Sequence, residues 1–258
     1  EALPAKIRDI PTPIKHRLQQ MLSEYQAKNS PLLTWSVEYN DKFWLIEDNA
    51  QALGTEKKIV RNSIMTTSFY PTKNLGAYGD GGALFTNDDD IANKIKIICD
   101  HGSAKKYYYD SIGVNSRLDS MQAAILNAKL PHLDTYNQKR QAAAAQYDNL
   151  LIDIPGIQIP ERAANSTHVF HQYTIRVKTN RDGLKDHLQA QGIPAMIYYP
   201  VPLHMSDAYR SYGYNTGDFP VSEQISHEVL SLPMHTELDA EQIQFICEAI
   251  KSYVAIPA

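Results

Sequence analysis

The chain has 258 residues, of which 43% are hydrophobic and 21% are charged, and its formal net charge is -4. This composition is that of a globular protein and excludes disordered and fibrous classes, while the acidic balance, with tyrosines not interleaved with Lys or Arg, excludes a nucleic-acid partner. No apolar run approaches the roughly 20 residues of a membrane helix and the first thirty residues lack a signal-peptide core, so we expect a cytoplasmic protein without a membrane partner.

The first segment, residues 1–38, carries several prolines, and an apolar stripe in residues 14–25 predicts an amphipathic helix there. KFWLIE, residues 42–47, is short, apolar and aromatic, which is typical of a buried strand. This strand ends at Asp48. Polar groups at the carboxyl end of a strand are a common place for an α/β site.

Two further strands are predicted at residues 64–68 and 83–86, and the run Asn87, Asp88, Asp89 predicts a helix start. Three helices are expected to follow, at residues 91–102 with Gly102 as the stop, at 121–130 and at 138–151. The interruption between the last two is expected at Pro131.

The pattern changes after Pro155 and Gly156, where strand-like and helix-like segments of a small α+β domain are expected. The strands are predicted at residues 168–177 and 195–201, and the helices at residues 181–192 and 237–254.

Metal ligands are not expected. Cys99 and Cys247 each lie in a helix-like segment, which predicts buried thiols rather than a disulfide or a zinc site. His168 and His171 are three residues apart on a predicted strand, so their imidazoles would point to opposite faces.

Lys73 stands in the loop SFYPTKNLGAYGDGG, which runs from Ser68 to Gly82. Most lysines are solvated, so a surface turn is one interpretation. The other rests on Ser68, Thr72 and the glycines, whose hydroxyls and closely approaching N–H groups suit a phosphate. An amine beside a phosphate pocket points to a Schiff base with a phosphorylated aldehyde.

Pyridoxal phosphate also needs a carboxylate against its ring nitrogen, because a protonated ring accepts electrons from a carbanion. Asp48, at the end of KFWLIED, could supply that carboxylate, although an Asp in this position could also be a turn or cap residue.

The pairing of IEDNAQALG with SFYPTKNLGAYGDGGALFTND resembles the DegT/DnrJ/EryC1/StrS family, whose members use pyridoxal 5'-phosphate to aminate nucleotide-linked keto-sugars. The resemblance continues through DHGS at 100–103, GVNSRLDSMQAAIL at 113–126, FHQYTIRV at 170–177, YYPVPLH at 198–204 and SLPMH at 231–235. It implies an α/β protein of aminotransferase fold type I, with an incomplete large domain built on a mainly parallel sheet and a small C-terminal α+β domain. The implied division is an atypical segment at 1–38, a partial cofactor-binding domain with linking helices at 39–151, and the small domain at 152–258.

The resemblance also implies roles for five residues. Lys73 and Asp48 would be catalytic, as the Schiff-base lysine and the partner of the pyridine nitrogen. Gln51 would lie near the phenolic oxygen of the cofactor, and Ser68 would bind its phosphate. Asn115 would reach the phosphate in the neighbouring subunit, which implies a homodimer.

Tyr199 and His204 would lie on the sugar-nucleotide side, although a structural turn around Pro200 and Pro202 explains them equally well. The implied reaction passes an amine from an amino-acid donor, glutamate in this family, to a keto-sugar, with Lys73 moving the proton. Lysine rather than histidine at this position favours transamination over dehydration. The motifs favour a dTDP-linked 3-keto-6-deoxyhexose as substrate.

One part of the family pattern has no counterpart. Residues 1–38 contain no glycine and therefore no glycine-rich phosphate loop, and TEKKIVRNSIM, residues 55–65, replaces a glycine-containing turn. We therefore keep two interpretations: a sugar aminotransferase, and a truncated, non-catalytic homologue that acts as a binding or assembly subunit.

Overall fold

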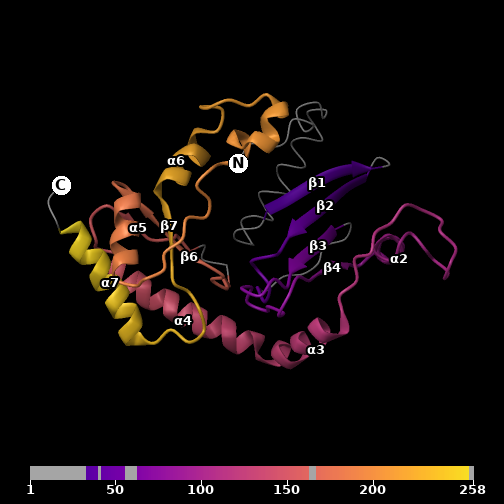
Figure 1. Cartoon of the computed structure of the whole chain (residues 1–258), viewed down its shortest axis with the longest axis horizontal. Coiled ribbons are helices and arrows are strands. Elements are labelled where there is room, and N and C mark those ends of the chain that lie inside the picture. The colour runs from indigo at the N-terminus through magenta and orange to yellow at the C-terminus, as the bar shows by residue number, and fades with distance from the viewer. Residues whose placement is uncertain (1–32, 40–41, 56–62, 163–166, 256–258) are drawn as a thin grey trace. The chain divides into compact units, whose positions relative to one another are not determined.

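The computed structural model describes residues 33–39, 42–55, 63–162 and 167–255 (Figure 1). The helix expected at residues 14–25 lies outside them. The described residues form two compact units. The N-terminal unit takes in those between 26 and 138 and those between 164 and 171, and the C-terminal unit takes in those between 139 and 163 and those from 172 onward. The domain boundaries expected after residues 38 and 151 remain predictions.

The N-terminal unit contains a four-stranded sheet of order β1-β2-β3-β4. Its strands are β1 (Leu33–Tyr39), β2 (Lys42–Asp48), β3 (Ser63–Ser68) and β4 (Gly82–Thr86), the last three of which were expected. The sheet was expected to be mainly parallel, but only β2 and β3 pair in parallel, while the two outer pairs are antiparallel. Only residues 40 and 41 separate β1 from β2, and a connection this short allows antiparallel pairing alone, because a parallel pair needs a longer crossover.

The helices α2 (Asp89–Cys99) and α3 (Ser120–Lys129) of this unit begin at side-chain caps, and the cap at Asp88 was expected. Asp88 accepts a hydrogen bond from the Ile91 N–H at the start of α2, and Asp119 caps α3. A 3-10 turn, η2 (Leu130–His132), contains Pro131 and leads directly into α4 (Leu133–Leu151). The boundary between the two units falls within α4.

The C-terminal unit holds an antiparallel sheet of order β5-β6-β7. Its strands are β5 (Ile157–Gln158), β6 (Tyr173–Val177) and β7 (Val229–Leu232), its helices are α5 (Arg181–Ala190), α6 (Pro220–Glu228) and α7 (Ala240–Val254), and its 3-10 turns are η3 (Leu203–Met205) and η4 (Asp207–Tyr212). Leu184 of α5, Ile250 of α7 and Leu230 of β7 have no exposed surface. They form part of the core that joins sheet and helices.

One strand prediction in this part of the chain is too long, and a second is wrong. The strand expected at 168–177 begins only at Tyr173, and Phe170 has a positive φ of 43°, which breaks an extended strand. His168 and His171 therefore do not lie on a strand, and the argument from opposite faces fails. Instead, the Phe170 N–H donates to His168 Nδ1 (3.0 Å).

The strand expected at residues 195–201 is reduced to a single bridge between Met196 and Ser231. Pro200 has no N–H for a ladder, so the segment cannot extend as a regular strand.

Within the described ranges, no helix is both long enough and apolar enough to cross a membrane. Among the same residues, no group of three or more His, Cys, Asp or Glu could hold a metal ion.

Candidate active site

Asp48 is the last residue of β2, and the parallel pairing with β3 places it opposite Thr66. The chain then turns, and the turn is held to β3 because the Asn49 N–H donates to the Thr66 carbonyl (2.8 Å). The Thr67 hydroxyl donates in turn to the Asn49 carbonyl (3.3 Å). Asp48 Oδ1 accepts from the Ala50 N–H (3.0 Å), which orients the carboxylate. Asp48 is thus presented at the carboxyl end of the strand pair, as the sequence predicts.

Lys73 lies in the loop between β3 and β4. The loop is closed by main-chain hydrogen bonds from Phe69 to the Gly81 carbonyl (2.7 Å), from Ala77 to the Phe69 carbonyl (2.8 Å) and from Lys73 to the Tyr70 carbonyl (2.8 Å). Its four glycines have no positive φ, so left-handed backbone does not explain them. Close approach explains one of them, because a Cβ on Gly76 would lie 2.3 Å from the Pro71 carbonyl oxygen.

The residues that follow Lys73 anchor this loop. Leu75 and Ala77 are buried in a cluster with Leu126 and Leu133. The Lys129 ammonium donates to the Gly76 carbonyl (2.7 Å). Lys73 itself is half-buried at the edge of this anchored stretch.

The electrostatics of Lys73 involve Asp48. Desolvation by burial lowers the pKa of the Lys73 ammonium, and the Asp48 carboxylate opposes this effect. The structure therefore brings the two predicted catalytic residues within electrostatic reach. A lowered pKa increases the fraction of neutral amine, which is the nucleophilic form.

The residues around Lys73 fit a phosphorylated aldehyde. Ser68 Oγ accepts from the Tyr70 N–H (3.2 Å), which leaves the Ser68 hydroxyl hydrogen available to donate to an anion. Ser68 ends β3, directly beside the turn that presents Asp48. An amine with a lowered pKa could hold the aldehyde of pyridoxal phosphate, a carboxylate could hold its ring nitrogen, and a hydroxyl donor could hold its phosphate.

Gln51 and Asn115 are both exposed. Gln51 lies in the turn after Asp48. Asn115 lies between α2 and α3, where it forms a main-chain bridge with Asp100 and accepts from Arg117 Nε through Oδ1 (3.1 Å). The Asn115 side chain thus contacts Arg117, which is not one of the predicted cofactor residues.

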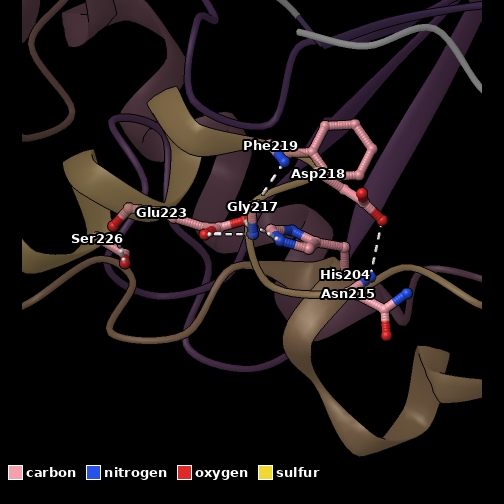
Figure 2. A network of polar contacts seen from close by, with 7 residues as sticks. All are labelled: His204, Asn215, Gly217, Asp218, Phe219, Glu223 and Ser226. Carbon is pink, nitrogen blue, oxygen red and sulfur yellow. Dashed lines mark hydrogen bonds and ion pairs between the residues drawn. The ribbon is translucent and has the colours of Figure 1, made fainter.

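Tyr199 and His204 belong to the C-terminal unit. Tyr199 is exposed, whereas the His204 side chain is buried and its Nε2 lies 2.9 Å from Glu223 Oε1 (Figure 2). Glu223 also accepts from the Gly217 N–H (2.9 Å) and the Phe219 N–H (3.3 Å). Desolvation raises the pKa of Glu223, but the hydrogen bonds from Gly217, His204 and Phe219 outweigh it and bring that pKa below its ordinary value. The His204 ring is held within this network.

Sequence reasoning missed the carboxamide and ammonium groups that hold the loop. Gln122 Oε1 accepts from the Tyr78 N–H (2.8 Å), and Asn74 donates to Asn137 Oδ1 (2.7 Å). Asn74 was visible next to Lys73, but its partner is distant in sequence and no local pattern marks it.

Comparison with known proteins gives one consistent family. The model of the DegT/DnrJ/EryC1/StrS aminotransferase family matches residues 36–251. A "Pleiotropic regulatory protein" of Geobacillus stearothermophilus is 48% identical over 215 residues, which are 81% of this chain and 58% of the relative. The dTDP-3-amino-3,4,6-trideoxy-alpha-D-glucose transaminase of Streptomyces venezuelae is 40% identical over 213 residues, which are 81% of this chain and 56% of that enzyme.

Among solved structures, S. venezuelae DesV matches with a TM-score of 0.79 and 39% identity, covering 83% of this chain and 58% of that one. The chain therefore spans less than two thirds of the length of these relatives. The match confirms the expected fold type of the aminotransferases, whose family uses pyridoxal phosphate.

Proposed function

Because this chain belongs to the DegT/DnrJ/EryC1/StrS aminotransferase family, we propose that it acts in the pyridoxal-phosphate-dependent amination of a nucleotide-linked keto-sugar. The proposed substrate is a dTDP-linked 3-keto-6-deoxyhexose, with glutamate as the amino donor. The observation that carries the proposal is the half-buried Lys73, with its lowered pKa and with Asp48 in electrostatic reach.

Four residues of the N-terminal unit would hold the cofactor. The Lys73 amine would carry its aldehyde carbon, and Asp48 would face its ring nitrogen. The Ser68 hydroxyl would donate to its phosphate, and Gln51 would lie near its phenolic oxygen. When bound, pyridoxal phosphate supplies an electron sink for the carbon that loses its proton.

Lys73 also moves the proton in the proposed reaction. Once its amine is free, it would carry a proton between the substrate carbon and the aldehyde-derived carbon of the cofactor, acting as a general base at one carbon and as a general acid at the other. Burial supports this role, because it lowers the pKa of the Lys73 ammonium and so favours the neutral amine. The closed loop that holds Lys73 limits the positions that this amine can reach.

A homodimer is part of the proposal, with Asn115 directed to the partner's cofactor. Exposed apolar residues near Asn115 in the sequence support it, since Tyr107 is 75%, Ile112 97% and Met121 74% exposed. Tyr199 and His204 are proposed for the sugar-nucleotide side, and the network with Glu223 would then orient His204.

The test is an absorbance titration of the purified chain with pyridoxal phosphate, followed by borohydride reduction and peptide mapping. We expect a band near the visible edge and a reduced label on Lys73. Lys73→Ala should lose both the label and glutamate-dependent amination of the keto-sugar, whereas Lys94→Ala, at an exposed lysine of α2, should keep both. Absence of band and label in the wild-type chain would favour the non-catalytic binding or assembly subunit.

A further inference from the structure

Asn74 follows Lys73 directly in the sequence and its side chain joins two distant segments. Its Nδ2 donates to Asn137 Oδ1 (2.7 Å) and to the Val169 carbonyl (2.9 Å). Both partners are acceptors, so the nitrogen of this carboxamide must face them and the orientation of the amide is determined. Asn74, the residue directly after Lys73, is therefore fixed in position by these two hydrogen bonds.

Asn137 connects this loop to the Asp48 turn. It is 5% exposed on α4, and its Nδ2 donates to the Leu53 carbonyl (3.2 Å). Asn49, the residue after Asp48, begins a turn in which its carbonyl accepts from the Ala52 N–H (3.1 Å). Leu53 comes directly after this turn. One buried carboxamide therefore contacts both segments that carry the predicted catalytic residues.

The approach of Asn137 to this turn is built into the backbone. Gly54 has a φ of 92°, and a Cβ on it would lie 2.2 Å from Asn137 Nδ2. Only glycine combines this left-handed conformation with room for the amide.

We propose that Asn74 and Asn137 are positioning residues whose hydrogen-bonded pair sets the separation between the Lys73 loop and the Asp48 turn. This inference rests on the proposed function insofar as Lys73 and Asp48 form its site. The other side-chain ties of the loop act further along the chain, because Lys129 contacts Gly76 and both Lys129 and Gln122 come from α3. The Asn pair links the residue next to Lys73 to Leu53 in the segment that follows Asp48.

The pair predicts an effect on the Lys73 amine that does not require the cofactor. Lys73 is partly desolvated and lies within electrostatic reach of the Asp48 carboxylate, and desolvation is the larger of the two influences on its pKa. If the pair is broken and the loop moves away from the turn, Lys73 becomes more solvated and its pKa rises towards the ordinary value. A pair that serves only as packing would lower stability without moving this pKa.

The experiment measures acetylation of Lys73 by acetic anhydride as a function of pH in the cofactor-free chain, read by mass spectrometry with an unstructured lysine-containing peptide added as reference. We expect the midpoint for Lys73 in the wild type to lie below that of the reference peptide. Asn74→Ala and Asn137→Ala should each move it upward, towards the value of the reference peptide. The double variant should move it no further than the larger single change, because the two residues form one link.

Gln122→Ala is the matched control, since it removes one carboxamide hydrogen bond from the same loop without touching the bridge, and its Lys73 midpoint should stay at the wild-type value. Circular dichroism and thermal unfolding report whether each variant folds. If Asn137→Ala does not fold, Asn137→Asp replaces it, because its ionised side chain still accepts from Asn74 but cannot donate to Leu53. Folded variants with an unchanged Lys73 midpoint would overturn the proposal.

A parallel titration with pyridoxal phosphate separates this inference from the proposed function. A midpoint that moves in a chain that never takes up the cofactor would support the positioning pair and count against the aminotransferase. Cofactor uptake together with a Lys73 midpoint that does not move in the variants would support the aminotransferase and overturn the positioning pair.

Discussion

Gly76→Ala is the sharpest perturbation of the Lys73 loop that the structure offers. The added Cβ would lie 2.3 Å from the Pro71 carbonyl oxygen and 2.8 Å from its carbon, whereas ordinary van der Waals contact begins at 3.4 Å. The obstructing atoms belong to the main chain of the same loop, so the loop itself must shift. A shift of about 1 Å would restore ordinary contact between the Cβ and the Pro71 oxygen. Overpacking of this kind costs about 1 to 3 kcal/mol of unfolding free energy. A misplacement of about 1 Å can cost about 100-fold in turnover.

Gly79→Ala is the matched control in the same loop. Its Cβ would meet only the end of the Gln122 side chain, at 3.3 Å from Nε2, which can move by a few tenths of an ångström. Both substitutions restrict the unfolded chain alike, so the difference between them isolates the clash. We would measure urea unfolding and amination of the keto-sugar for both. Equal stability and equal turnover of the two variants would refute the steric argument.

Three further predictions concern the C-terminal unit. Arg181→Met should lower the unfolding free energy by about 3 kcal/mol in urea melts, because the buried guanidinium donates to the Ser226 and Val229 carbonyls. Arg210→Met removes an exposed ion pair with Asp207 and should change the unfolding free energy by less than about 0.5 kcal/mol. Desolvation raises the pKa of Glu228, but hydrogen bonds and charges from neighbouring side chains outweigh it and bring the pKa to about 2. The stabilisation by Glu228 is therefore complete above the unfolded pKa of 4.5 and is lost as the pH falls towards 2. The difference in melting temperature between the wild type and Glu228→Gln should shrink over that range. A difference that stays constant would contradict this reasoning. Burial raises the pKa of the Cys247 thiol to about 12, so iodoacetamide at pH 8 should label half-buried Cys99 first, and equal labelling in the folded protein would contradict this.

The strands and helices of the N-terminal unit could largely be predicted, because their signals are local. Asp88 and Asp119 cap the helices that follow them, and KFWLIED ends where β2 ends. The same signals predicted where two of the proposed site residues lie in the fold. Asp48 and Ser68 end strands that pair in parallel, so they had to lie at one edge of the sheet, next to the Lys73 loop.

The segment at residues 195–201 shows why other predictions failed. Its apolar and aromatic residues are typical of a strand, but a strand exists only where a partner ladder is available, and here Met196 alone pairs with Ser231. Conversely, β7 carries no alternation, because all four of its residues are buried, and its sequence therefore gave no period-two signal.

The sequence by itself determined the family, the helix caps, the strand ends and the residue types that could perform the chemistry, because these depend on groups within a few positions of one another. Only the tertiary structure decided that Asn74 meets Asn137, 63 positions away, and that His204 faces Glu223, 19 positions away. Such contacts depend on how loops close and cores pack. Their energy is realised only once the whole unit has folded.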